Sequence, residues 1–329
     1  MIHNRHYLKM MNNKFKIVDL PGNIKYSIDL FICSSSFEER CLSIPFQISK
    51  IDYNKVFICY NANHTSNINN TKYLLDLFNK KSVEIKFNSE RPLSIAENFY
   101  LALKNSLTSP KLNIILDITT FTHEALLIII KILSLFKDRI ENLYILYVGA
   151  REYSYNQKDE DKWLSKGIGN IRTVLGYSGL INPSNSNHLI ILFGFEYERT
   201  SKLIDTFDSY KVSLGFGSKW ESINQNHYKI NYERHLKLMQ YYPRCEKFEF
   251  SLTDPYSTKK ILIDQISKFP NYNTIIASMN NKISTIGAAL VGIKDKNIQL
   301  CYVTANQYNI ECYSIPSEDY YFYTLSFNN

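Results

Sequence analysis

The sequence predicts an α/β protein with two Rossmann-like lobes and mainly parallel sheets. Short apolar runs typical of buried strands alternate with helical stretches at the spacing of βαβ units. A series of five such elements occurs twice in the same order. The chain has 329 residues, 45% of them hydrophobic, which is enough for two cores of about 150 residues each. We therefore expect an internal duplication with two lobes related by a pseudo-two-fold axis.

The first lobe is expected over residues 25–155, after an N-terminal segment (residues 1–24) with a short edge strand and a Pro21-Gly22 turn. Its clearest feature is residues 113–133, where an apolar run, a polar turn and a helix that is apolar nearly all round follow one another. Such a run is typical of a strand covered on both faces. The strands of this lobe are predicted at residues 26–33, 55–60, 82–87, 113–118 and 143–148, with helices to about residue 49, at 71–79, at 95–106 and after the polar turn.

The second lobe is expected over residues 187–329. Its strands are predicted at residues 188–193, 211–215, 247–251, 273–278 and 298–304, with helices at 254–268 and within 279–290. Residues 156–186 form a connector that holds four of the eleven glycines, together with Lys166 and Arg172. These cations and glycines either cradle phosphates or belong to an ordinary β-turn connector.

Composition limits the classes of function. Lys and Arg exceed Asp and Glu by seven, but the lysines are scattered, so the charge argues only weakly for a polyanionic partner. The six cysteines include no C-x-x-C pair, which favours reduced, buried thiols over a zinc site or disulfides. No apolar stretch approaches 18 residues, so we expect a cytoplasmic protein without a membrane span.

The strongest candidate site follows the strand at 113–118. A carboxylate at the end of a strand and hydroxyls at a helix N-terminus lie where open α/β sheets bind ligands. Asp117 could accept ribose hydroxyls, and threonine hydroxyls could bind phosphates; the alternative is that they cap the helix. The hydroxyl-bearing candidates of this site are Ser34, Ser35 and Ser36 after the first strand and Thr119, Thr120 and Thr122 in the turn. His123 and Glu124 form either a proton-transfer pair or a structural helix start.

A Phe-Glu pair followed by Arg occurs after the first strand of both lobes. In the first lobe Ser36 to Glu39 fits a capping box, so Glu38 and Glu39 are either helix caps or catalysts. A cap needs no arginine, and Arg40 could face a ligand phosphate or pair with a carboxylate of the other lobe. The corresponding residues of the second lobe are Glu196 and Arg199, and Arg151 is a further predicted anion contact.

The segment DITTFTHEALL (residues 117–127) resembles the nucleotide-contacting strand, turn and helix of CARF domains. Two such lobes in one chain resemble the SAVED domains of bacterial antiviral systems. The resemblance implies that a crevice between two Rossmann-like lobes binds a cyclic oligonucleotide, which some members cleave, and it assigns the contacts to Asp117, Thr119 and Thr120. The turn has Phe-Thr-His-Glu where CARF domains usually carry glycines and a lysine.

Three functions remain open. The first is a nucleotide-binding protein of anti-phage defence that senses a nucleotide second messenger in the crevice between the lobes, with no other cofactor. The second is a nucleotide or NAD-type hydrolase that uses Glu38 or Glu39 with His123 and Glu124. The third is a non-catalytic scaffold subunit that assembles with a partner from the same operon or with itself. A fold analogy by itself does not choose among them.

Overall fold

The computed structural model describes residues 13–63, 65–107 and 109–327. The chain folds as two compact units: residues up to Arg151 and from Ser314 onward form the first, and Glu152 to Tyr313 form the second. Each unit is a mixed α/β structure around a mostly parallel sheet, which confirms the predicted α/β class and the mainly parallel sheets.

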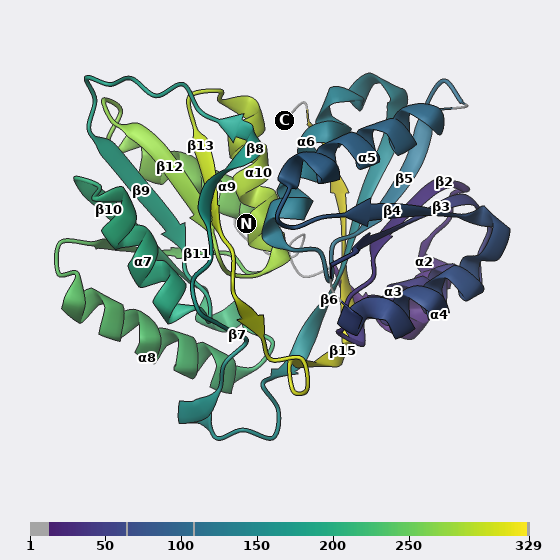
Figure 1. The fold of residues 1–329 in the computed structure, drawn as a ribbon, viewed down its shortest axis with the longest axis horizontal. Coiled ribbons are helices and arrows are strands. Elements are labelled where there is room, and N and C mark those ends of the chain that lie inside the picture. Colours follow the sequence, from purple (N-terminus) through teal and green to yellow (C-terminus); the bar gives the residue numbers. More distant parts are fainter. Residues whose placement is uncertain (1–12, 64, 108, 328–329) are drawn as a thin grey trace, which may run out of the picture. The chain divides into compact units, whose positions relative to one another are not determined.

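The first unit has a seven-stranded sheet in the order β1-β15-β6-β5-β2-β3-β4. The five strands from β6 to β4 run parallel to one another. In Figure 1, α3 and α4 cover one face of this sheet and α5 and α6 the other. The strands are β1 (Lys14–Lys16), β2 (Ile28–Ser34), β3 (Tyr53–Asn61), β4 (Ser82–Phe87), β5 (Leu112–Asp117), β6 (Ile140–Tyr153) and β15 (Ser314–Leu325). The main helices are α3 (Arg40–Ile48), α4 (Ile68–Phe78), α5 (Pro92–Asn105) and α6 (His123–Leu135).

The second unit has a six-stranded sheet in the order β11-β10-β9-β12-β13-β8. The strands from β11 to β13 are parallel, and β8 joins antiparallel to β13. Here α7 and α8 cover one face and α9 and α10 the other (Figure 1). The strands are β8 (Ile171–Ser178), β9 (Asn187–Leu192), β10 (Lys211–Gly217), β11 (Glu246–Phe250), β12 (Asn273–Ser278) and β13 (Gln299–Val303). The helices are α7 (Tyr197–Phe207), α8 (Gln225–Tyr241), α9 (Pro255–Ser267) and α10 (Lys282–Lys294), and a two-stranded ribbon joins β7 (Ser165–Lys166) to β14 (Gln307–Tyr308).

The structure differs from the sequence prediction in several elements. Pro21 and Gly22 lie in a one-turn helix, α2 (Leu20–Asn23), rather than in a turn, because proline fits the first turn of a helix. The expected connector contains the edge strand β8, and the last strand, β15, belongs to the sheet of the first unit. The sequence analysis also missed α8, whose many polar residues hide the helical period.

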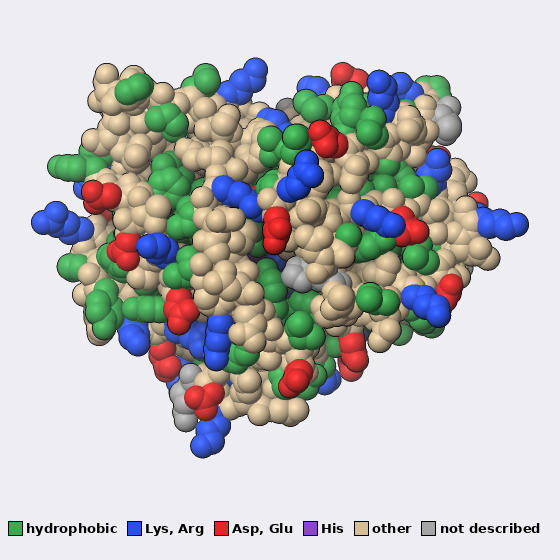
Figure 2. Space-filling model, viewed as in Figure 1, with side chains coloured by type: hydrophobic (Ala, Val, Ile, Leu, Met, Phe, Trp, Pro, Cys, Tyr) green, Lys and Arg blue, Asp and Glu red, His purple; other side chains and the backbone are tan. Residues whose placement is uncertain are grey.

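The core of each unit lies between its sheet and helices. Leucine, isoleucine and phenylalanine side chains of the central strands are fully buried, as expected for strands covered on both faces. Among the described residues, no helix has the length and apolar character needed to cross a membrane. On the face shown in Figure 2, lysines and arginines lie among acidic side chains and form no patch of one sign.

Candidate functional site

The strand order of each sheet defines where a ligand would bind. The five parallel strands of the first unit lie in the order 3-2-1-4-5 when numbered along the chain, and those of the second unit do the same. Successive strands are therefore added on one side of β2 and then, from β5 onward, on its other side. The same reversal occurs between β9 and β12. In open α/β sheets, ligands bind outside the carboxyl ends of the strands at this switch point.

One hydrogen bond ties the two turns at each switch point. In the first unit Thr120 Oγ1 donates to the carbonyl of Ser34, at 2.8 Å. In the second unit Asn280 Nδ2 donates to the carbonyl of Phe193, at 2.6 Å. The structure therefore brings together the serine turn and the threonine turn that the sequence analysis selected.

Asp117 ends β5 and is 2% exposed. Its Oδ1 accepts hydrogen bonds from the backbone N–H of Thr119, at 3.0 Å, and from the hydroxyl of Thr119. That hydroxyl oxygen also accepts from the N–H of Val148, at 3.1 Å. Burial raises the pKa of Asp117 to about 7, although the bonds from Thr119 and the charge of Arg40 favour the carboxylate. Asp117 and Thr119 thus belong to a buried network.

Arg40 pairs with a carboxylate of its own unit. Its Nε donates to Glu38 Oε2 at 2.8 Å, and its Nη1 donates to the carbonyl of Val148 at 3.2 Å. Ser314 of β15 also donates to Glu38 Oε2, at 2.9 Å. Arg40 is 4% exposed. The structure therefore places the guanidinium of Arg40 against a carboxylate and a backbone carbonyl of the first unit; the two predicted roles of Arg40, a phosphate contact or a partner for a carboxylate of the other lobe, stay predictions.

The predicted capping box is wrong. Glu39 is the N-cap residue of α3, and its side chain makes no capping hydrogen bond. Ser36 Oγ instead accepts from the N–H of Glu38, at 3.3 Å, and Glu38 is held by Arg40. Glu39 is exposed.

The arginine of the second unit makes the same type of contact. Arg199 Nη1 donates to the carbonyl of Val303 on β13 at 2.9 Å, and Nη2 lies 3.5 Å from a carboxylate oxygen of Glu196. Each arginine lies in the first turn of the helix that follows the first parallel strand of its unit. Its side chain reaches the fifth parallel strand, past the end of the fourth. The recurring Phe-Glu and Arg pattern is therefore a buried clamp between a helix start and a strand.

The other hydroxyls of the first unit are divided between internal and accessible positions. Ser35 Oγ shares a hydrogen bond with Thr71, at 2.8 Å, and Ser34 is also buried. Thr122 is exposed and caps α6 by accepting from the N–H of Ala125, at 3.2 Å, as the capping alternative predicted. His123 and Glu124 open α6, where Glu124 is 2% exposed.

The remaining predicted contacts lie away from the serine and threonine turns along the chain. Arg151 is exposed near the end of β6. Lys166 and Arg172 belong to β7 and β8 of the second unit, and the Lys166 ammonium lies 4.4 Å from the ring centroid of Trp163. Across the part of the chain that the structure describes, no three His, Cys, Asp or Glu side chains are grouped to hold a metal.

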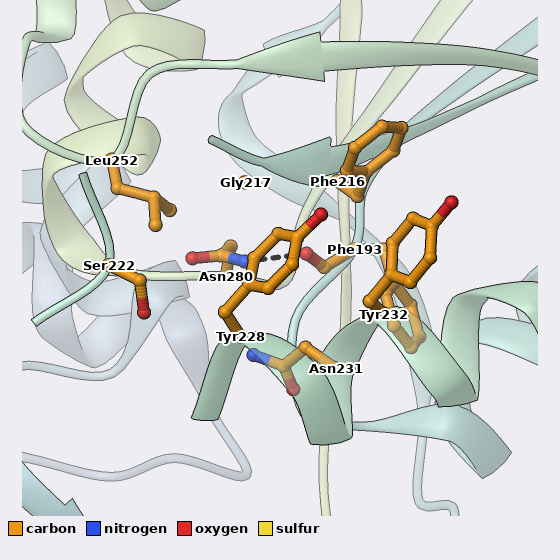
Figure 3. A pocket seen from close by; sticks show the side chains of 9 residues that line it. All are labelled: Phe193, Phe216, Gly217, Ser222, Tyr228, Asn231, Tyr232, Leu252 and Asn280. Carbon is orange, nitrogen blue, oxygen red and sulfur yellow. Dashed lines mark hydrogen bonds between the residues drawn. The ribbon is translucent and has the colours of Figure 1, made fainter. Parts of the chain in front are cut away.

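The sequence analysis missed a pocket at the carboxyl ends of the strands of the second unit (Figure 3). It has a volume of about 40 Å³. It is lined by Phe193, Phe216, Gly217, Ser222, Tyr228, Asn231, Tyr232, Leu252 and Asn280. Three of these residues come from α8, so the pocket could not be predicted without predicting this helix. The signal in the sequence was tyrosine and asparagine residues at helical spacing.

Comparison with known proteins assigns no relationship: no protein-family model matches the chain, and no curated protein matches it significantly.

Proposed function

We propose that this chain is a nucleotide-binding protein whose first unit binds its ligand at the carboxyl ends of β2 and β5. The observation that carries the proposal is the 3-2-1-4-5 order of the parallel strands, with a serine turn and a threonine turn joined at the switch point. This is the place where α/β sheets of this order bind nucleotides.

The accessible groups at this edge suit a phosphate ester. Thr122 is exposed, Thr120 is half-buried, and both lie beside the N-terminus of α6. Backbone N–H groups and the helix dipole favour an anion at such a position. The buried side chains of Asp117 and Arg40 hold the serine turn and the threonine turn in place through their hydrogen bonds, and they are positioning residues in this proposal.

The ligand class proposed is a nucleotide second messenger of bacterial antiviral defence, sensed in the cytoplasm. The resemblance of residues 117–127 to CARF domains supports this class, as does the presence of two sheets with one strand order. The matching contacts of Arg40 and Arg199 support descent of the two units from one duplicated lobe.

Thermal-shift measurements with mass spectrometry test the proposal. The purified chain is mixed with cyclic oligonucleotides, NAD and mononucleotides, and each mixture is then analysed for intact ligand. A ligand at 100 times its dissociation constant adds about 2.7 kcal/mol of stability, a shift of a few degrees. We expect Thr122→Val to weaken this shift, while Thr253→Val in the second unit leaves it unchanged. Absence of a shift with every ligand, or an equal loss in both variants, contradicts the proposal.

A hydrolase is the second candidate because a carboxyl group, Asp117, ends β5 at the switch point of the first sheet, and burial raises its pKa to about 7. The predicted catalyst Glu38 is engaged by Arg40; the other predicted catalysts are Glu39, His123 and Glu124. Consumption of a ligand in the mass spectra, abolished by Asp117→Asn with binding retained, would favour the hydrolase. If neither binding nor turnover occurs and a protein co-purifies, the scaffold function is favoured.

A further inference from the structure

The face of α8 that carries Tyr228, Asn231, Tyr232 and His235 is unusual for a helix that covers a sheet. These residues recur at intervals of three and four, so they lie on one side of the helix. A helix that only covers a sheet carries aliphatic side chains on that side, as α6 does with its run of leucines and isoleucines. The polar and aromatic composition of this face therefore calls for a different explanation.

Three buried polar atoms on this face have no hydrogen-bond partner. They are Oδ1 of Asn231 and both ring nitrogens of His235, as judged over the described residues. His235 is 1% exposed, and its ring centroid lies 4.9 Å from that of Phe216 and 6.0 Å from that of Phe193. Buried polar atoms in folded proteins are nearly always paired. Unpaired buried polar atoms beside a pocket thus indicate a place where a ligand can supply the missing hydrogen-bond partner.

The walls of the pocket are suited to a flat ring. Tyr228 and Tyr232 stack with centroids 5.6 Å apart and an interplanar angle of 15°, and Phe216 meets Tyr232 at 66°. Figure 3 shows the two tyrosine rings rising from α8 toward the strand end that carries Phe216. None of the nine lining residues carries a charge. The lining thus favours an uncharged aromatic group over a phosphate.

The size of the pocket limits what enters it. Its volume of about 40 Å³ compares with roughly 10–15 Å³ for one water molecule, so the edge of a ring fits and a whole nucleotide does not. The Asn280 amide nitrogen is already bonded to the Phe193 carbonyl, and its Oδ1 accepts from the N–H of Asn281 at 2.8 Å. Of the two asparagines in the lining, Asn231 is therefore the one whose side-chain oxygen has no hydrogen-bond partner among the described residues.

We propose that this pocket binds the amine-bearing edge of an uncharged heteroaromatic ring, the chemistry of adenine and cytosine. The exocyclic amine donates to Asn231 Oδ1, and the ring stacks on the tyrosines of α8. All residues of this site belong to the second unit. The inference goes beyond the nucleotide site proposed for the first unit, and either can fail without the other.

Titration of the full-length chain with nucleosides tests the inference, followed by saturation-transfer NMR of the nucleoside protons. Adenosine and cytidine carry the amine, and inosine and uridine replace it with a carbonyl oxygen. We expect at least one amine-bearing nucleoside to bind saturably and its oxo analogue to bind roughly tenfold more weakly, the effect of one lost hydrogen bond. This comparison needs no variant and so does not depend on the folding of one.

Two variants of α8 localise the binding. Asn231→Leu removes the orphaned oxygen with little change in volume and is expected to weaken binding roughly tenfold. Gln240→Leu is the matched control, an exposed amide on the same helix, and is expected to bind like the original chain. The inference is overturned if neither amine-bearing nucleoside binds, if the oxo analogues bind equally well, or if Asn231→Leu retains full affinity.

Discussion

The guanidinium of Arg40 donates a hydrogen bond to the backbone carbonyl of Val148, 3.2 Å away on β6. The N–H of the same valine donates to Thr119 Oγ1, at 3.1 Å. Val148 is therefore fixed from both sides, by the start of α3 and by the turn after β5. This links the Glu38 pair to Asp117 in one buried network at the switch point of the first sheet.

Replacing Arg40 should destabilise the first unit strongly. Arg40→Met leaves the buried Glu38 carboxylate without its partner, and we expect a loss of about 3–5 kcal/mol in the free energy of unfolding. The double variant with Glu38→Gln should lose less, because no uncompensated charge remains. Urea unfolding followed by far-UV circular dichroism measures both.

The two tryptophans provide an internal control, because Trp163 and Trp220 both belong to the second unit. Arg40→Met should shift the circular dichroism transition more than the tryptophan fluorescence transition, and Arg199→Met should do the reverse. Equal shifts of both signals in both variants would mean that the contacts of Arg40 and Arg199 do not stabilise their own units separately.

Asp117 should make the first unit less stable as the pH rises. Its pKa is about 7 in the folded protein and 3.8 in its ordinary state, so the folded form holds a proton that the unfolded form has lost between these values. Stability is then greatest near pH 4, falls toward pH 7 and stays level above it, with a total effect of up to about 4 kcal/mol. Asp117→Asn keeps an acceptor for Thr119 and should flatten this profile. A variant with an unchanged slope would show that another group controls it.

Three buried histidines should give the second unit the opposite pH dependence. Burial lowers the pKa of His188, His227 and His235 to about 4, so each stays neutral in the folded protein while it gains a proton on unfolding below about pH 6.5. The free energy of unfolding of the second unit is therefore greatest above pH 6.5 and decreases as the pH falls toward 4. The decrease is at most on the order of 3 kcal/mol per histidine.

Tryptophan fluorescence during urea unfolding at pH 7.5 and at about pH 5 reports this loss for the second unit. His235→Phe should remove part of it, since a phenyl ring suits the aromatic contacts of this residue with Phe216 and Phe193. A midpoint that does not change between the two pH values would contradict the prediction.

A side chain at Gly194 should disturb the switch point of the second sheet. A Cβ atom there would overlap the backbone of Met279 and lie 2.9 Å from the Cα of Asn280. Gly194→Ala should therefore strain the bond from Asn280 to Phe193 and cost on the order of 1–3 kcal/mol. The control is Gly22→Ala in α2, where a Cβ meets nothing within 4 Å and alanine should stabilise the helix by about 0.5–1 kcal/mol. Thermal unfolding that ranks Gly194→Ala at or above the original chain would exclude the strain.

The sequence by itself determined the alternation of strands and helices, because hydrophobic periodicity is a local property. The strand at residues 82–87 was predicted with the bounds that the structure shows, and β9 and β12 differ from prediction by one residue or less at each end. The cap at Thr122 was also among the predicted alternatives, since capping depends on neighbours three residues apart. Helix α8 escaped prediction because its polar face belongs to a pocket.

Only the tertiary structure decided which side chains meet. Glu38 and Arg40 were recognised as a recurring pair, but their contacts with Ser314 and Val148 join segments far apart in the sequence. The membership of β15 in the first sheet is decided in the same way, by pairing with β1 near the other end of the chain. The raised pKa of Asp117 follows from burial, which no local pattern encodes. Composition and periodicity fix the elements; long-range packing fixes their partners, and with them the chemistry of the site.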